Sequence, residues 1–325
     1  MKRRELIRLL GGVAAWPLAA RAQQQMPIIG FLCSASPAPW AHFVAAFRAG
    51  LKETGYVDGR NVTIEFRWAE GVYDRLPAMA ADLVRRKVAV LISTGGVPPI
   101  IAAKAATAII PIVFTLGTDP VQLGIIDSLS RPGGNVTGAV LFTAMIHTKR
   151  LGLLRDTVPT ATSIAALENP KNPNSAGVTN SIEDAARTVG GQVHFLHASN
   201  EHELDAAFAA LARLRAGALL VASDPFFSAQ RNHVVALAAR HAVPAIYEER
   251  QFATVGGLMS YGANFGESYR QAGIYTGRIL KGEKPSDLPV VQSTKFELVI
   301  NLRTAKALGL EVPPGVSAQA DDIIE

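Results

Sequence analysis

Four turns in this chain join an apolar, strand-like segment to a helical one, and each carries a side chain that can accept a backbone N–H. They are Ser93-Thr94-Gly95-Gly96, Thr118-Asp119-Pro120, Asn172-Pro173 and Asp224-Pro225. Such a side chain caps the following helix, and proline suits a first helical turn. The free N–H groups of a helix N-terminus suit a carboxylate or another anion. Helix stability alone explains any one turn, but four in consecutive units predict a ligand site.

Two further groups of residues follow strand-like segments. Ser34 and Ser36 come after the first apolar run, and we expect them at the same edge of the sheet as the four turns. Tyr247, Glu248 and Glu249 follow a later run. This later group is either a solvated loop with a local ion pair, or an aromatic lid beside a carboxylate that receives a ligand ammonium group.

The sequence predicts no metal, cofactor or catalytic centre. The seven histidines are scattered, and no cysteine or acidic cluster completes a metal-binding set. The chain lacks a G-x-S-x-G motif, a phosphate-binding loop and a G-x-G-x-x-G after its first strand. We therefore expect a protein that binds a ligand without transforming it.

The elements that must position these turns alternate regularly along the chain. Apolar runs typical of buried strands are followed by amphipathic segments, and one of these, residues 121–129, is expected to be a helix. In the first half the expected strands are 27–32, 62–68, 88–92, 109–114 and 137–142, and in the second half they include 163–167, 192–197, 218–222 and 244–247. This alternation predicts an α/β fold with parallel sheets covered by helices on both faces. No flexible linker separates the halves, so the chain is expected to cross between them as a strand near residue 143.

The N-terminus is typical of an export signal. Residues 1–8 are basic, residues 9–20 carry no charge, and Ala20-Arg21-Ala22 fits a signal-peptidase site, which predicts cleavage after Ala22. The uncharged stretch is too short to span a membrane. Arg3-Arg4 also fits the twin-arginine pattern, so two export routes stay open. Removal of 22 residues from 325 leaves 303, enough for two domains.

Charge and cysteine content restrict the class of protein further. The net charge of the whole chain is +5, but five cations and one acid lie in the expected signal, so the mature chain carries about +1. No basic run with interleaved aromatic residues is present, which argues against nucleic acid as a partner. The single cysteine, Cys33, cannot form an intramolecular disulfide and lies too far beyond the cleavage site for lipid anchoring. We expect a soluble mature protein with Cys33 buried at a strand end.

Several segments carry a resemblance to a known family. They include PIIGFL, AFRAGLKETGY, PIVFTLGTDPVQLG, SRPGGNVTG, ALLVASDPFF, GIYTGRILKGEKPSDLPV and FELVINLRTAKALGL, and with the signal they cover essentially the whole chain. They resemble the substrate-binding proteins of ABC transporters, of the type that includes tryptophan- and tyrosine-associated binding proteins. The resemblance implies a type I periplasmic binding protein: two Rossmann-like lobes with parallel sheets, joined by a three-segment hinge. The expected lobes are residues 27–142 with 252–283, and residues 143–251 with 284–325.

The resemblance also implies a site and a role. Ligand contacts are expected from Ser34, Ser36, Thr94, Gly95, Thr115 and Asp119 in the first lobe, and from Asn169, Asp224 and Tyr247 in the second. The implied role is that of a periplasmic monomer that binds a small polar or aromatic, amino-acid-like acid and delivers it to an ABC permease. Two alternatives remain at this point: a secreted α/β enzyme that uses Asp224 or Glu248 as acid or base, and a sensory ligand-binding module.

Overall fold

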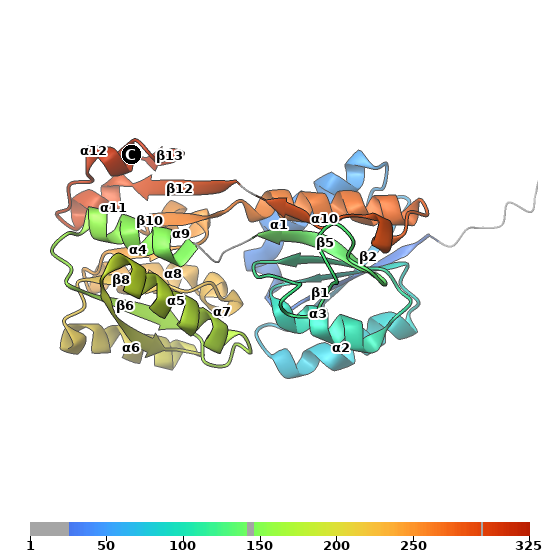
Figure 1. Cartoon of the computed structure of the whole chain (residues 1–325), viewed down its shortest axis with the longest axis horizontal. Helices are drawn as coiled ribbons and strands as arrows, with labels where there is room; N and C mark the ends of the chain where they lie inside the picture. Colours follow the sequence, from blue (N-terminus) through green and yellow to red (C-terminus); the bar gives the residue numbers. More distant parts are fainter. Residues whose placement is uncertain (1–25, 142–145, 294) are drawn as a thin grey trace, which may run out of the picture.

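The chain folds into two α/β lobes that lie side by side (Figure 1). The computed structural model describes residues 26–141, 146–293 and 295–325. The expected signal peptide and its cleavage site lie outside the described residues. One sheet of six strands and one of seven form the centres of the lobes.

The first lobe is built on a parallel sheet with the strand order β11-β5-β4-β3-β1-β2. Its buried strands take up the apolar runs of the sequence, and its helices cover both faces: α1 and α10 on one, α2 and α3 on the other. The strands are β1 (Ile28–Cys33), β2 (Thr63–Trp68), β3 (Val90–Thr94), β4 (Ile112–Leu116), β5 (Val136–Leu141) and β11 (Val291–Ser293). The helices are α1 (Pro37–Glu53), α2 (Leu76–Arg85), α3 (Val97–Ala106) and α10 (Phe265–Leu280).

The second lobe has the strand order β13-β12-β10-β9-β8-β6-β7, with β12 antiparallel to β10 and the other pairs parallel. Its strands are β6 (Ser163–Glu168), β7 (Gln192–His197), β8 (Ala218–Val221), β9 (Ala245–Tyr247), β10 (Met259–Ala263), β12 (Phe296–Asn301) and β13 (Asp322–Ile324). Its helices are α4 (Ile146–Thr157), α5 (Ser175–Val189), α6 (Glu201–Leu214), α7 (Pro225–Ala229), α8 (Arg231–Arg240), α9 (Arg250–Thr254), α11 (Leu302–Ala307) and α12 (Pro314–Ser317). The expected fold of two lobes with mainly parallel sheets is present.

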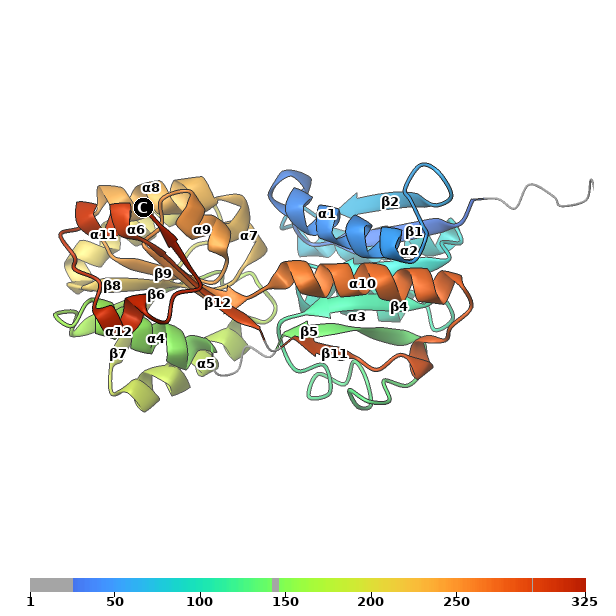
Figure 2. The same ribbon diagram turned by 90° about the horizontal axis from the view of Figure 1, so that it is seen from above.

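Three segments connect the lobes, between β5 and α4, between β10 and α10, and between β11 and β12 (Figures 1 and 2). The crossing expected near residue 143 falls in residues 142–145, outside the described part of the chain. The second and third crossings differ from the expected ranges, because β10 pairs within the second sheet and β11 within the first. Residues 252–263 therefore belong to the second lobe and residues 284–293 to the first. The last two crossings are tied together by the Asn264 N–H, which donates to the Lys295 carbonyl at 3.2 Å.

The prediction of a helix over residues 121–129 is wrong. This segment is a series of turns, because Gly124 has a φ of +63°, a left-handed conformation that interrupts a helix. Asp119 accepts the N–H of Val121 at 2.8 Å, and Lys104 of α3 donates to the carbonyls of Gly124 and Ile125 at 3.1 and 2.6 Å. The segment is thus held by turn contacts and by α3.

Each lobe has its own apolar core. The buried apolar residues of the described chain fall into four clusters, two in each lobe, and none of the four includes residues of both lobes. The relative position of the lobes therefore depends on the hinge and on contacts across the cleft. In the described part of the chain, no helix is both long enough and apolar enough to cross a membrane.

Candidate ligand-binding site between the lobes

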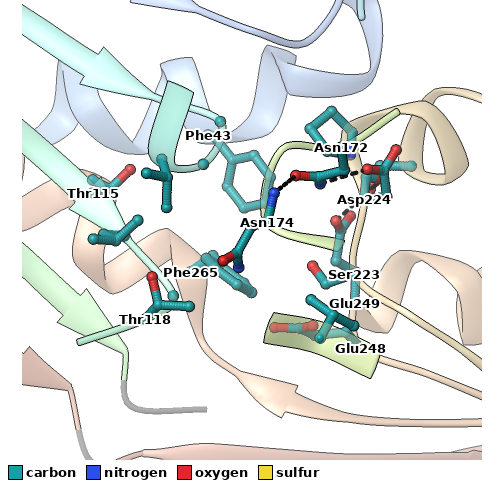
Figure 3. A pocket seen from close by; sticks show the side chains of 18 of the residues that line it. Phe43, Thr115, Thr118, Asn172, Asn174, Ser223, Asp224, Glu248, Glu249 and Phe265 are labelled. Atoms are coloured by element: carbon teal, nitrogen blue, oxygen red, sulfur yellow. Dashed lines mark hydrogen bonds between the residues drawn. The ribbon is translucent and has the colours of Figure 1, made fainter. Parts of the chain in front are cut away.

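A cavity lies between the lobes, where the carboxyl ends of strands from both sheets face each other (Figure 3). The turns that follow β3 and β4 line it from the first lobe, together with α1 and α10. The turns that follow β6, β8 and β9 line it from the second lobe. This is the edge at which open parallel sheets bind ligands.

The first-lobe wall is largely aromatic. Phe43 of α1 stacks on Tyr269 of α10, with ring centroids 4.7 Å apart and planes at 14°. Trp40 and Phe265 meet the Phe43 ring edge-on at 5.2 and 6.0 Å. All four side chains line the cavity. Such a wall offers apolar area and stacking geometry for a planar ring.

A chain of hydrogen bonds behind this wall orients one hydroxyl toward the cavity. The Trp40 indole N–H, which can only donate, donates to the Tyr269 oxygen at 2.7 Å. The Tyr269 hydroxyl contacts Thr94, whose oxygen lies 2.7 Å from that of Thr115. In each of these two hydroxyl pairs either oxygen can be the donor, and one consistent arrangement has Tyr269 donate to Thr94 and Thr94 donate to Thr115. Thr115 lines the cavity, and in that arrangement its own hydrogen is available to a ligand.

The turn from β3 to α3 brings main chain to the cavity. Gly95 and Gly96 have φ values of +87° and +109°, which favour glycine, and a Cβ on Gly95 would lie 2.5 Å from the Ser34 oxygen. Gly96 occupies the N-cap position of α3 without a side-chain cap. Pro98 and Pro99 in the first turn of α3 carry no N–H, so the donors without a side-chain cap at this end of the helix are the N–H groups of Gly96 and Val97.

Asp224 is the best-satisfied of three carboxylates on the second-lobe wall. It receives hydrogen bonds from the Asn169 and Asn172 side-chain amides at 3.1 and 2.7 Å, and from the Phe226 N–H at 2.8 Å. Burial raises the pKa of Asp224, and these three donors oppose that shift. Asp224 caps α7 and shapes the wall, with little capacity left for a ligand.

Glu248 and Glu249 complete this acidic wall. Glu248 pairs at 2.9 Å with Arg150, a fully buried arginine of α4 that also donates to the Tyr261 carbonyl at 2.7 Å. Glu249 accepts the Ser228 hydroxyl at 2.6 Å through one oxygen. Its other oxygen is buried and has no hydrogen-bond partner among the residues that the structure describes. Burial raises the pKa of Glu249, and the neighbouring Glu248 adds to this effect.

His147 adds a neutral polar group to the same lobe. Burial and the nearby Arg150 lower the pKa of its imidazole to about 3, so the ring is uncharged at neutral pH. It lines the cavity at the start of α4. The charge of the second-lobe wall therefore comes from the carboxylates and not from His147.

The expected site residues fall into three groups. Gly95, Thr115 and Asp224 line the cavity. Three others lie directly behind lining residues and bond to them: Ser34 to the Gly95 carbonyl, Thr94 to Thr115, and Asn169 to Asp224.

The third group lies away from the cavity. Ser36 is the N-cap residue of α1, and Asp119 caps the turn at Val121. Tyr247, expected as a lid, is fully buried and stacks on Phe252 in the core of the second lobe, with centroids 4.6 Å apart. A tyrosine in a central strand of the sheet points into the core, whereas the two glutamates after it reach the cavity.

The sequence prediction missed the aromatic wall, and it named Glu249 only within a group that could be either a solvated loop or a lid beside a carboxylate for a ligand ammonium group. Phe43 and Tyr269 carry the helical spacing of core residues, and nothing in that spacing separates a residue facing the sheet from one at the cavity. Trp40 is also a buried part of this wall. Within the described residues, no group of three or more histidine, cysteine or acidic side chains is arranged to hold a metal ion.

Solved structures of high similarity share this two-lobe fold. An ABC-transporter domain from Streptococcus pneumoniae in complex with L-Trp is 25% identical, with a TM-score of 0.82 over 92% of this chain and 99% of that one. The ligand-free, open structure of a substrate-binding protein from Clostridium difficile is 26% identical, with a TM-score of 0.65 over 92% and 99%. A glucose-galactose binding protein from Geobacillus stearothermophilus shares the fold alone, at 15% identity, a TM-score of 0.62, and coverage of 85% and 98%. The expected fold, that of a type I periplasmic binding protein, is confirmed.

Sequence comparison leads to the same group. A tyrosine-binding protein of Clostridioides difficile is 30% identical over 265 residues, which cover 82% of this chain and 76% of that protein. These relatives bind solutes and are not enzymes. The family model for ABC transporter substrate-binding proteins matches residues 38–324, and this chain belongs to that family.

Proposed function

We propose that this protein is the periplasmic solute-binding component of an ABC importer, and that it holds an aromatic amino acid in the cleft between its lobes. The observation that carries the proposal is a complementary pair of walls across one cavity. The first lobe supplies four aromatic rings and a donor hydroxyl, and the second supplies a buried carboxylate oxygen without a partner. The tyrosine-binding relative and the structural neighbour in complex with L-Trp support a ligand of this class.

The charges and donors suggest how such a ligand is oriented. Its carboxylate would receive the Thr115 hydroxyl and the N–H groups of Gly96 and Val97, which precede the two prolines of α3. Its ammonium group would donate to the free oxygen of Glu249. The ring would pack against Phe43 and its aromatic neighbours. Each ligand end then meets the lobe that can compensate its charge, so that binding requires both lobes.

Isothermal titration calorimetry with three indole ligands tests this orientation. L-tryptophan has both charged ends, tryptamine lacks the carboxylate, and indole-3-propionate lacks the ammonium group; L-tyrosine serves as a second amino acid. Glu249→Gln should weaken L-tryptophan binding roughly 10- to 100-fold, the value of a charged hydrogen bond, and leave indole-3-propionate unchanged. Thr115→Val should weaken L-tryptophan by roughly fivefold and leave tryptamine unchanged.

The control is Glu283→Gln, which removes a partly exposed carboxylate paired with Arg278 far from the cleft. It should bind all ligands as the unmodified protein does. Failure of the folded, unmodified protein to bind either amino acid would refute the proposed ligand class.

Export and delivery are proposals of the same kind. Residues 1–22 would direct the chain to the periplasm, where it would act as a monomer. Cell fractionation with N-terminal sequencing should find a mature chain that begins at Gln23. The double substitution Arg3→Lys and Arg4→Lys should block export by the twin-arginine route and leave general secretion intact.

Deletion of the gene should abolish uptake of the labelled amino acid; normal uptake would instead favour a sensory role.

A further inference from the structure

A direct contact joins the lobes at the rim of the cleft. Arg231, the first residue of α8 in the second lobe, donates through Nη2 to the carbonyl of Pro39 in the first turn of α1, at 3.1 Å. Its Nε donates to the carbonyl of Ser228 in its own lobe, also at 3.1 Å. The guanidinium thus spans two main-chain acceptors, one in each lobe. Helices α1 and α7 contact each other at this point (Figure 2).

Arg231 is not among the residues that line the cavity. Its acceptors are backbone carbonyls of the protein, so the bridge needs no ligand atom. It does need the lobes to be close together, since Pro39 and Arg231 lie in lobes that share no core cluster. The bridge therefore distinguishes a closed arrangement of the lobes from an open one.

The bridge is adjacent to the proposed ligand contacts on both sides. On the second lobe, Ser228 donates its hydroxyl to Glu249, a cavity-lining residue whose other oxygen is buried without a partner among the described residues. On the first lobe, Pro39 precedes Trp40, whose indole begins the hydrogen-bond chain to Thr115. Arg231 thus holds together the two elements that carry the opposite walls of the site.

We propose that Arg231 is a positioning residue: it stabilises the closed arrangement through the Pro39 carbonyl, and so raises ligand affinity without touching the ligand. This rests on the proposed function only in that the cleft is the ligand site. A ligand that binds the closed form has an apparent Kd that rises as the fraction of closed protein falls. The ligand-free protein must therefore be more open, and the ligand must leave faster, when the bridge is removed.

The test compares Arg231→Ala and Arg231→Lys with Arg240→Ala as a matched control. Arg240 is the exposed last residue of the same helix. A lysine keeps one cationic donor but cannot span both carbonyls, so Arg231→Lys should restore part of the effect. Thermal unfolding first establishes that the variants are as stable as the unmodified protein.

The first readout is lobe separation without ligand. Spin labels on Lys52→Cys in the first lobe and Lys306→Cys in the second report the distance, and Cys33 is buried and stays unlabelled. Arg231→Ala should shift the distances toward longer values, and Arg240→Ala should not. Identical distance distributions for Arg231→Ala and the unmodified protein would overturn the proposal.

The second readout is binding of L-tryptophan and L-tyrosine. Arg231→Ala should raise Kd by roughly 3- to 20-fold, the range for one charged hydrogen bond that is partly exposed, mainly through faster dissociation. An unchanged dissociation rate would also overturn the proposal. If the unmodified protein binds neither amino acid, the proposed ligand class fails, while the lobe distances still decide the role of Arg231.

Discussion

Glu249 is a cavity-lining carboxylate with only one of its two oxygens in a hydrogen bond among the described residues. One oxygen of its carboxylate accepts from Ser228, and the other has no partner in the described part of the chain, although the side chain is buried. A buried carboxylate that lacks partners disfavours its charged form, which is why its pKa is raised. An ammonium group placed at the free oxygen would remove this cost, so the arrangement favours a cationic ligand group over a neutral one.

This predicts a specific dependence of binding on pH. Burial raises the pKa of Glu249 above its ordinary value of 4.5, and an ammonium group bound beside it would lower that pKa. Affinity should therefore be highest above the raised pKa and fall by up to tenfold per pH unit below it. Binding should release protons in this range, which calorimetry in buffers of different ionisation enthalpy detects. Glu249→Gln should abolish both effects, and their persistence in that variant would contradict the assignment to Glu249.

At the scale of elements, the strands and most helices follow from the sequence because each has a local signal. Buried runs such as residues 88–92 become parallel strands, and Ser36 with Pro37 marks the start of α1. The exception at residues 121–129 has a local cause too, since Gly124 adopts a left-handed conformation that helical spacing does not reveal.

The sheet to which a strand belongs is not a local property. β10 and β11 are short, and their pairing depends on neighbours far away in the chain, which explains why the second and third crossings were misplaced. The residues of the site likewise divide into those with a local signal in the sequence and those brought together only by tertiary packing. Gly95 and Asp224 were predictable because they follow strands, and the family resemblance implied Thr115, which lies near the end of β4. Phe43 and Tyr269 meet only through the packing of α1 on α10.

The packing of α1 on α10 is therefore a good place to test how the aromatic wall is held. These helices lie side by side (Figure 2), and glycines allow their backbones to touch. A Cβ at Gly273 of α10 would overlap the Phe47 carbonyl oxygen and lie 2.7 Å from the Leu51 nitrogen of α1.

Gly273→Ala should destabilise the protein by about 1–3 kcal/mol, the usual cost of overpacking, and displace Tyr269 from Phe43. Denaturant unfolding gives the free energy, and L-tryptophan affinity reports the displaced wall. The matched control is Gly152→Ala in α4, where a Cβ would meet nothing within 4 Å. That variant should be as stable as the unmodified protein or more stable by up to about 1 kcal/mol. Equal stability of both variants would contradict close α1–α10 packing.

At the scale of the whole molecule, the lobes are two separately packed bodies. No core cluster of the described residues crosses between them, and three hinge segments connect them. Domains without a shared core are expected to move relative to one another. The arrangement here is more similar to the L-Trp complex than to the open, ligand-free relative, with TM-scores of 0.82 and 0.65 at nearly equal identity. The lobes are therefore arranged more as in the ligand-bound relative than as in the open one, as expected of the closed form of a protein that closes by hinge motion.

Small-angle scattering should accordingly show two states in solution. Without ligand, the radius of gyration should exceed the value calculated from the closed structure, because the described parts of the two lobes share no core cluster that would oppose opening. Saturating L-tryptophan should lower the radius of gyration to the value of the closed structure. At a ligand concentration of about 100 times Kd, binding should also raise the free energy of unfolding by about 2.7 kcal/mol. Tryptamine, which lacks the group that would bond to the first lobe, should close the protein incompletely. A scattering curve that is the same with and without a bound amino acid would mean that the lobes are rigidly joined, and that affinity owes nothing to closure.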